Sequence, residues 1–199
     1  MPHTPPVDLA NRARHNRKHG ATFAISCDTR EGVVVAVGAV DAEGAEATSL
    51  SDLLRNAVPA LVTSQAALGS ALAALDKLVV THARERRDDA IAASIALLAF
   101  DADACELAIA SAGRHVHVAF VDGVGERRAL HAKAAALGTS LSGDDAVARI
   151  SLHRDDTVVA STVSLADEWY AASERTAAGA LAASDSAEAS AAILGPIGV

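Results

Sequence analysis

The amino-acid sequence predicts a single α+β domain built around antiparallel β-structure. The chain has 199 residues, of which 51% are apolar, and this is the size and composition of one domain with its own core. Its apolar residues repeat at helical spacing from residue 49 to residue 79 and at strand-like spacing after residue 90. The links between the later runs are only a few residues long, which favours antiparallel neighbours over crossover helices.

The predicted strands are apolar runs that end at turns rich in aspartate or glycine. They lie at Thr22–Cys27, Val33–Val40, Ile91–Phe100, Glu106–Ser111, Arg114–Val121, Arg127–His131, Val147–Leu152 and Thr157–Val163. The run Val-Val-Val-Ala-Val that starts at Val33 is apolar throughout, which is typical of a strand buried on both faces. We expect the middle runs to form a meander and the last two to pair as a hairpin.

Three helices are predicted. Ser49 followed by Asp52 resembles a capping box and predicts a helix start, and Pro59 is expected to interrupt or kink that helix. Leucine and valine at three- and four-residue steps predict a second helix at residues 68–79. The third helix is expected at Leu165–Ala183, with Trp169 and Tyr170 packing it onto the sheet. The first two helices should lie together on one face of a sheet.

Composition divides the chain into three parts. Residues 1–19 are rich in proline, arginine and histidine without an apolar period, and we expect a flexible N-terminal arm. Residues 20–183 hold the predicted strands and helices and form one domain. Residues 184–199 are predicted to be an alanine- and serine-rich C-terminal tail.

Charge and cysteine content restrict the classes of partner and compartment. A net charge of -8 argues against nucleic acid as the main partner. The basic runs Arg12–Lys18 and Arg84–Arg87 are interpreted as solvated faces, with a small anion-docking patch as the alternative. No stretch is long and apolar enough to span a membrane, and Cys27 and Cys105 form no C-x-x-C pattern. We expect a soluble, cytoplasmic protein with reduced thiols.

No complete catalytic or metal-binding motif occurs in the sequence. Phosphate-binding loops and the serine elbow G-x-S-x-G are absent. His115 and His117 are expected on one face of a strand, and His15 and His19 on one helix turn, so each pair could chelate zinc. Each pair lacks an identified third ligand, and we interpret these histidines as polar surface residues.

The order of predicted elements, together with three segments, resembles the metal-dependent type 2C (PPM) protein phosphatases, in particular the bacterial sporulation-phosphatase branch. The segments are VVVAVGAVDAEGAEA at Val33–Ala47, ACELAIASAGRHVHV at Ala104–Val118 and DTVVASTVSLAD at Asp156–Asp167. They are similar to the D-x-S-G-x-G turn, the A-N-A-G-H hairpin and the T-D-G strand end of that family. The resemblance implies an αββα sandwich, in which two antiparallel sheets are flanked by helices.

The resemblance also implies two Mg²⁺ or Mn²⁺ ions held between the sheets by aspartates at strand ends. Ala39 and Val163 occupy the positions that match two of these aspartates, and Ser164 replaces the glycine of T-D-G. The acidic pair near the family's N-terminus falls at Gly20 and Ala21. The sequence therefore predicts that the metal ligands are lost, and we expect no cofactor.

Some residues offer ways to rescue the site. Asp41, Glu43 and Asp167 are the carboxylates near enough in sequence to substitute as ligands, in which case Mg²⁺ or Mn²⁺ would bind. Arg14 or Arg17 is a candidate for contacting phosphate.

The functional hypothesis is a non-catalytic phosphatase-like domain, a pseudophosphatase, that acts by binding protein in a phosphorylation-linked regulatory pathway. The expected partner is a kinase, a phosphoprotein or an anti-sigma pathway component. One alternative is an active Mg/Mn-dependent Ser/Thr phosphatase with displaced ligands. The other is an unrelated α+β binding protein.

Overall fold

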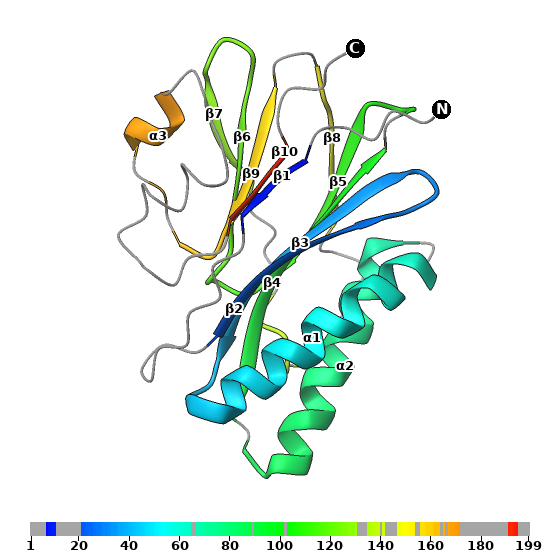
Figure 1. Cartoon of the computed structure of the whole chain (residues 1–199), viewed down its shortest axis with the longest axis vertical. Helices are drawn as coiled ribbons and strands as arrows, with labels where there is room; N and C mark the ends of the chain where they lie inside the picture. The colour runs from blue at the N-terminus through cyan, green and yellow to red at the C-terminus, as the bar shows by residue number, and fades with distance from the viewer. Residues whose placement is uncertain are drawn as a thin grey trace.

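The fold is a sandwich of two antiparallel sheets with a helix pair on one side (Figure 1). A computed structural model describes residues 7–10, 21–64, 67–88, 90–101, 103–130, 135–139, 141, 147–153, 156–163, 165, 167–171 and 191–194. Within these residues the helices are α1 (Gly44–Ser64), α2 (Leu68–Arg86) and α3 (Asp167–Ala171).

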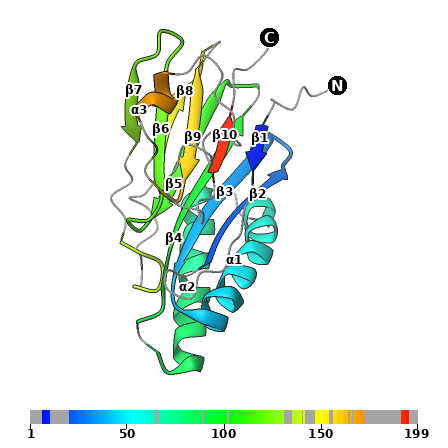
Figure 2. The ribbon, with the colours of Figure 1, turned by 60° about the vertical axis from the view of Figure 1, so that its left-hand side comes forward.

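Each sheet has five strands in the described part of the chain. The helix-covered sheet has the order β2 (Ala21–Asp28), β3 (Gly32–Asp41), β4 (Ala92–Asp101), β5 (Glu106–Ala112) and β8 (Val147–Ser151). The second sheet has the order β1 (Val7–Ala10), β10 (Ala191–Leu194), β9 (Thr157–Ser161), β6 (His117–Val121) and β7 (Arg127–Leu130). Figure 2 shows α1 and α2 together beside β2, β3 and β4, with α3 near β7.

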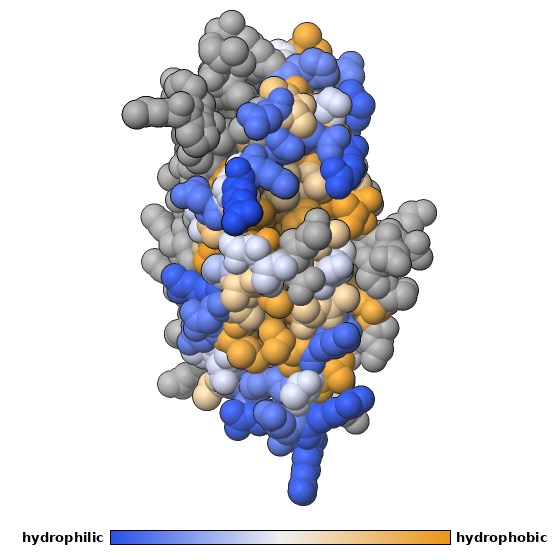
Figure 3. Space-filling model, turned by 90° about the vertical axis from the view of Figure 1, so that its right-hand side faces the viewer, coloured by the Kyte–Doolittle hydropathy of each residue, from blue (hydrophilic) through white to orange (hydrophobic). Residues whose placement is uncertain are grey.

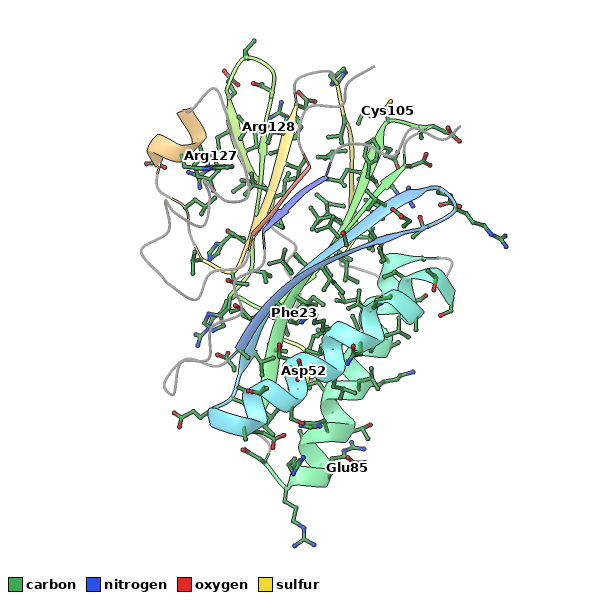
Figure 4. The ribbon with its side chains drawn as sticks, viewed as in Figure 1. Phe23, Asp52, Glu85, Cys105, Arg127 and Arg128 are labelled. Carbon is green, nitrogen blue, oxygen red and sulfur yellow. The ribbon has the colours of Figure 1, made fainter. Side chains whose placement is uncertain are left out.

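One hydrophobic core lies between the helix pair and the helix-covered sheet. Leu54 of α1 and Leu75 of α2 are fully buried there against alternate residues of β3 and β4. Phe23, which Figure 4 labels on β2, lies over Gly38 of β3. A Cβ at Gly38 would lie 2.4 Å from the ring of Phe23, so the ring fits only because residue 38 has no side chain.

A second hydrophobic core lies between the two sheets. It is made by the opposite faces of the same strands, including Val35 and Val37 of β3 and Leu98 of β4, and by Val118 and Val158 of the second sheet. The strands β3 and β4 are therefore buried on both faces, which confirms the interpretation of the continuous valine run.

Polar contacts join the helix pair to neighbouring segments. Glu46 near the start of α1 binds His82 of α2, and its second oxygen lies 3.5 Å from Arg86 Nε. The buried Asp76 carboxylate accepts the N–H groups of Gly138 at 2.7 Å and Leu141 at 3.0 Å. A carboxylate is costly to bury unless it accepts hydrogen bonds such as these. The two hydrogen bonds also hold the segment around residue 138 against α2.

Several predicted boundaries and pairings are wrong. Helix α1 begins at Gly44 rather than at Ser49, and it continues through Pro59 to Ser64. The predicted meander forms only in part: β4 pairs with β5 and β6 pairs with β7, but β5 and β6 belong to different sheets. The predicted hairpin does not form, because β8 belongs to the helix-covered sheet and β9 to the second sheet. Short links in a sandwich can cross between sheets, and sequence spacing does not distinguish such a crossing from a hairpin.

Both segments predicted to lie outside the domain contribute a strand. Val7–Ala10 falls within the expected arm 1–19, and it pairs in the structure with Ala191–Leu194 from the expected tail. Four-residue strands carry too short an apolar alternation to stand out beside proline-rich and alanine-rich flanks. The rest of the two segments lies outside the described residues, as does the predicted third helix beyond Ala171.

Among the described residues, no helix has both the length and the apolar character that a membrane crossing needs.

Candidate functional site

One end of the layer between the sheets is polar, and we call it the polar end; it is defined by the buried residues Thr22, Ser94, Ser111 and Thr162. Toward this end, the strand residues that face the layer change from apolar to hydroxyl-bearing. On the inter-sheet face of β4 the sequence runs Phe100, Leu98, Ala96 and then Ser94. On β5 the apolar residues of the same face give way to Ser111, and on β2 to Thr22. A buried layer thus becomes lined with hydroxyl groups.

Ala39 lies in the middle of this polar end. The strand register pairs it with Thr22 on one side and with Ser94 on the other. Because side chains alternate along a strand, the Ala39 methyl group points into the inter-sheet layer with Val35 and Val37. A small apolar group therefore stands between two buried hydroxyl-bearing residues.

The chain crosses between the sheets at the polar end, in the turn from Gly113 to Val116. Gly113 has a φ of +83°, and a Cβ on it would lie 2.2 Å from Ser94 Oγ, so only glycine fits without strain. The backbone N–H of His115 donates to the same Ser94 Oγ at 3.2 Å. Ser94 thus fixes the turn both by close packing and by a hydrogen bond.

The turn presents three ionisable side chains together with β3. Asp41 Oδ2 lies 3.1 Å from His115 Nε2, and the Nε–H of Arg114 points at the same nitrogen from 3.1 Å. Nε2 can donate to Asp41 or accept from Arg114, but it cannot do both. The His115 and Asp41 side chains are 39% and 51% exposed, so solvent reaches the cluster.

Comparison of the sequence with known families identifies the family to which the chain belongs. The profile of Stage II sporulation protein E (SpoIIE) matches residues 29–192. The chain belongs to the SpoIIE family. Among curated proteins, none matches the chain by sequence.

Solved structures similar to this SpoIIE-family chain share its fold. The RsbU and RsbW domains of a Mycobacterium tuberculosis protein superpose with a TM-score of 0.68 at 19% identity, covering 100% of this chain and 64% of that chain. The PP2C phosphatase domain of Bacillus subtilis SpoIIE, with a fragment of its regulatory domain, gives 0.67 at 12% identity, with 98% and 64% covered. The PPM Ser-Thr phosphatase MsPP from Mycobacterium smegmatis gives 0.65 at 12% identity, with 98% and 100% covered.

These comparisons confirm the predicted family and the predicted fold of two antiparallel sheets with helices. The chain spans less than two thirds of the M. tuberculosis and B. subtilis structures. At these identities the structural likeness concerns the fold.

The residues considered as substitute ligands for a metal site are engaged in other contacts or exposed. Asp41 pairs with His115, and Asp167 lies 2.8 Å from Arg127 Nη1, with its side chain 93% exposed. Arg127 also stacks on Tyr170, 3.8 Å from the ring centre; Figure 4 labels this arginine beside α3. Glu43 is exposed in the loop before α1.

The other predicted site residues divide between the polar end and the undescribed segments. Val163 follows β9 and is half-buried, and its carbonyl accepts the Ser161 hydroxyl at 2.5 Å. Ala21 is buried at the start of β2. Arg14, Arg17, the His15–His19 pair and Gly20 lie outside the described residues.

The described side chains do not fit the two-cation centre that the family implies. Over the described ranges, no three His, Cys, Asp or Glu side chains gather in a group that could hold a metal ion. Two hard cations need several oxygen ligands in a fixed geometry, and the buried hydroxyl groups beside Ala39 do not supply carboxylates.

The predicted placing of His115 and His117 on one strand face is wrong, and Cys27 is half-buried. His115 and His117 do not share a strand face, because β6 begins only at His117 and His115 belongs to the crossing turn. Cys27 is a structural thiol, half-buried on β2, and its Sγ–H donates to the carbonyl of Val34 at 3.7 Å. Burial, and secondarily the neighbouring Asp28, raise the pKa of this thiol, so little nucleophilic thiolate forms near neutral pH.

Ser94 and Arg114 were missed by the sequence reasoning. Arg114 stands at the histidine position of the A-N-A-G-H-like segment, and this departure from the pattern is the signal that could have identified it. Ser94 carries no signal in sequence, since its role depends on the close approach of Gly113 across the sheet.

Proposed function

We propose that this SpoIIE-family domain is non-catalytic and acts by binding a protein partner in a phosphorylation-linked regulatory pathway. The partner would be a kinase, a phosphoprotein or an anti-sigma pathway component. The domain would need no metal cofactor for this role.

The observation that carries the proposal is the position of Ala39. It lies between Thr22 and Ser94 at the polar end. The resemblance described above would have a metal-ligating aspartate at this position. Phosphoester hydrolysis of the PPM type depends on metal ions that activate water and neutralise phosphoryl oxygens. A methyl group cannot take the place of a carboxylate in either task.

A protein partner is supported by the relatives and by the surface. The M. tuberculosis structure joins an RsbU domain to an RsbW domain, and the B. subtilis structure joins its phosphatase domain to part of a regulatory domain. The face shown in Figure 3 carries hydrophobic surface between hydrophilic ends. Such mixed composition is that of many protein interfaces.

The test is a phosphatase assay with the full chain, Mn²⁺ or Mg²⁺, and p-nitrophenyl phosphate. We expect no hydrolysis above that of the metal salt alone. Metal-dependent turnover by the purified chain would overturn the proposal.

A second candidate is an active phosphatase with a displaced ligand, and the position of Asp41 favours it. Asp41 is two residues beyond Ala39 on β3, so the two side chains leave the strand on the same side. The Asp41→Asn substitution would then abolish hydrolysis, whereas Asp52→Asn, which changes an exposed carboxylate on α1, would not.

A further inference from the structure

We infer that Arg114 and His115 form a metal-independent binding site for the phosphoryl group of a phosphorylated serine or threonine on a partner protein. This inference rests on the proposed function and assigns the contact residues that it leaves open.

The turn that carries both side chains is held in place before any ligand arrives. Its backbone is fixed by the Ser94 hydroxyl, which accepts the His115 N–H, and by the close approach of Gly113 to the Ser94 side chain. Ser94 itself is 2% exposed, in the middle of a sheet. A preformed turn lowers the entropy cost of binding, because the two side chains start from a defined backbone position.

Arg114 has more N–H donors than the one that points at His115. The guanidinium of Arg114 carries five N–H donors, and one of them points at His115 Nε2. Among the residues that the structure describes, Arg114 forms no ion pair with a carboxylate, in contrast to Arg127 and Arg149. The exposed fork of Arg114 is therefore open to an external anion.

The shared nitrogen of His115 favours an anionic ligand with several oxygens. When Nε2 carries its proton it donates to Asp41, and the N–H of Arg114 then faces a donor instead of an acceptor. A phosphoryl oxygen placed between the two side chains would accept from both. Arginine is well suited to this task because its planar fork matches two phosphate oxygens.

The openness of the site favours a phosphoryl group carried by a protein over free phosphate. Arg114 is exposed, and the His115 side chain is 39% exposed. Small free ligands are usually held in concave sites that enclose most of their surface. A phosphorylated side chain gains the rest of its binding energy from the protein surface around it.

Asp41 is the competitor of the ligand in this arrangement. Its carboxylate occupies His115 Nε2, and its negative charge repels an approaching anion. Removal of that charge should strengthen phosphate binding, which is the opposite of what a metal-ligand role for Asp41 would give.

The test is a titration of the full-length chain, followed by ¹H–¹⁵N NMR, without metal. The probes are a capped Gly-phosphoserine-Gly peptide, its unphosphorylated form and inorganic phosphate. We expect the phosphopeptide to shift the amide signals of Gly113, Arg114 and His115, with a Kd of about 1–10 mM. Arg114→Gln should weaken this binding about tenfold or more, as expected for loss of a charge-assisted contact.

One variant serves as a control, and another tests the role of Asp41. Arg128→Gln removes the same charge from β7, where the guanidinium lies 5.6 Å from the centre of the Phe120 ring, and it should leave phosphopeptide binding unchanged. Asp41→Asn should tighten the binding by about threefold.

Three results would overturn the inference. These are no shift at residues 113–115, an equal loss of binding in the Arg114 and Arg128 variants, or binding of inorganic phosphate but not of the phosphopeptide. Each of them leaves the proposed function standing if the metal-dependent phosphatase assay stays negative, so the two failures are distinguishable.

Discussion

The two ends of the inter-sheet layer are built from the same strands and differ in what those strands place inside. At one end Val33, Phe100 and Leu107 close the layer with large apolar groups. At the other end Thr22, Ser94 and Ser111 occupy the equivalent alternate positions. The apolar end supplies stability, whereas the polar end gives up hydrophobic burial and carries the ionisable cluster of the crossing turn.

The largest expected effect is at the apolar end. Phe100→Ala removes a ring that is 3% exposed and leaves a cavity between the sheets. It should lower the free energy of unfolding by about 3–5 kcal/mol, measured by urea denaturation. Ser111→Ala at the polar end is the matched change and should cost about 1 kcal/mol or less. Equal losses for the two variants would show that the ends do not differ as described.

A smaller effect is expected in the crossing turn. Gly113→Ala forces a side chain into a backbone of φ +83° and against Ser94, which should destabilise the fold by about 1–3 kcal/mol. Because the same change displaces His115, it should also broaden or shift the His115 amide signal in NMR spectra. Ser94→Ala removes the nearest clashing atom, Oγ, while the Cβ and Cα of residue 94 would still lie 2.7 and 2.9 Å from the new Cβ, so it should restore only part of the stability. Additive losses in the double variant would contradict this contact.

The smallest effect concerns the Cys27 thiol. Its raised pKa means that the native state holds the thiol proton to higher pH than the unfolded chain does. In a Cys105→Ser background, the rate of thiol labelling should therefore rise at higher pH in the native than in the urea-unfolded protein, and at pH 8 it should be slower in the native protein. By linkage, the contribution of this thiol to stability is lost as the pH rises through the raised pKa. Asp28→Asn should shift the native curve toward lower pH.

Much of the fold could be predicted because its elements carry strong local patterns. The valine run of β3 and the leucine steps of α2 led to the right elements. The pairing of β5 with β8, and of β6 with β9, could not be predicted, because a short link encodes neither the sheet it leads to nor the partner it meets. The family resemblance supplied the two-sheet arrangement that local patterns left open.

The candidate site was predicted only in part. Ala39 and Asp41 were identified from a motif on one strand, where spacing alone determines which face a side chain occupies. The contact of Asp41 with His115 joins residues 74 positions apart through a crossing between sheets, and neither residue is unusual in its own segment. Sequence patterns indicate the secondary structure of a segment and which of its faces is buried. This cluster depends instead on how two segments far apart in the sequence are brought together in space.

The central claim is that the polar end, where the described side chains form no carboxylate cluster, cannot retain two hard divalent cations. Calorimetric titration of the full-length chain with Mn²⁺ at neutral pH tests it most directly. The account predicts no saturable heat of binding, and no change on the Asp41→Asn substitution. A two-site isotherm that this substitution removes would contradict the claim and restore the metal-dependent phosphatase as the function of the domain.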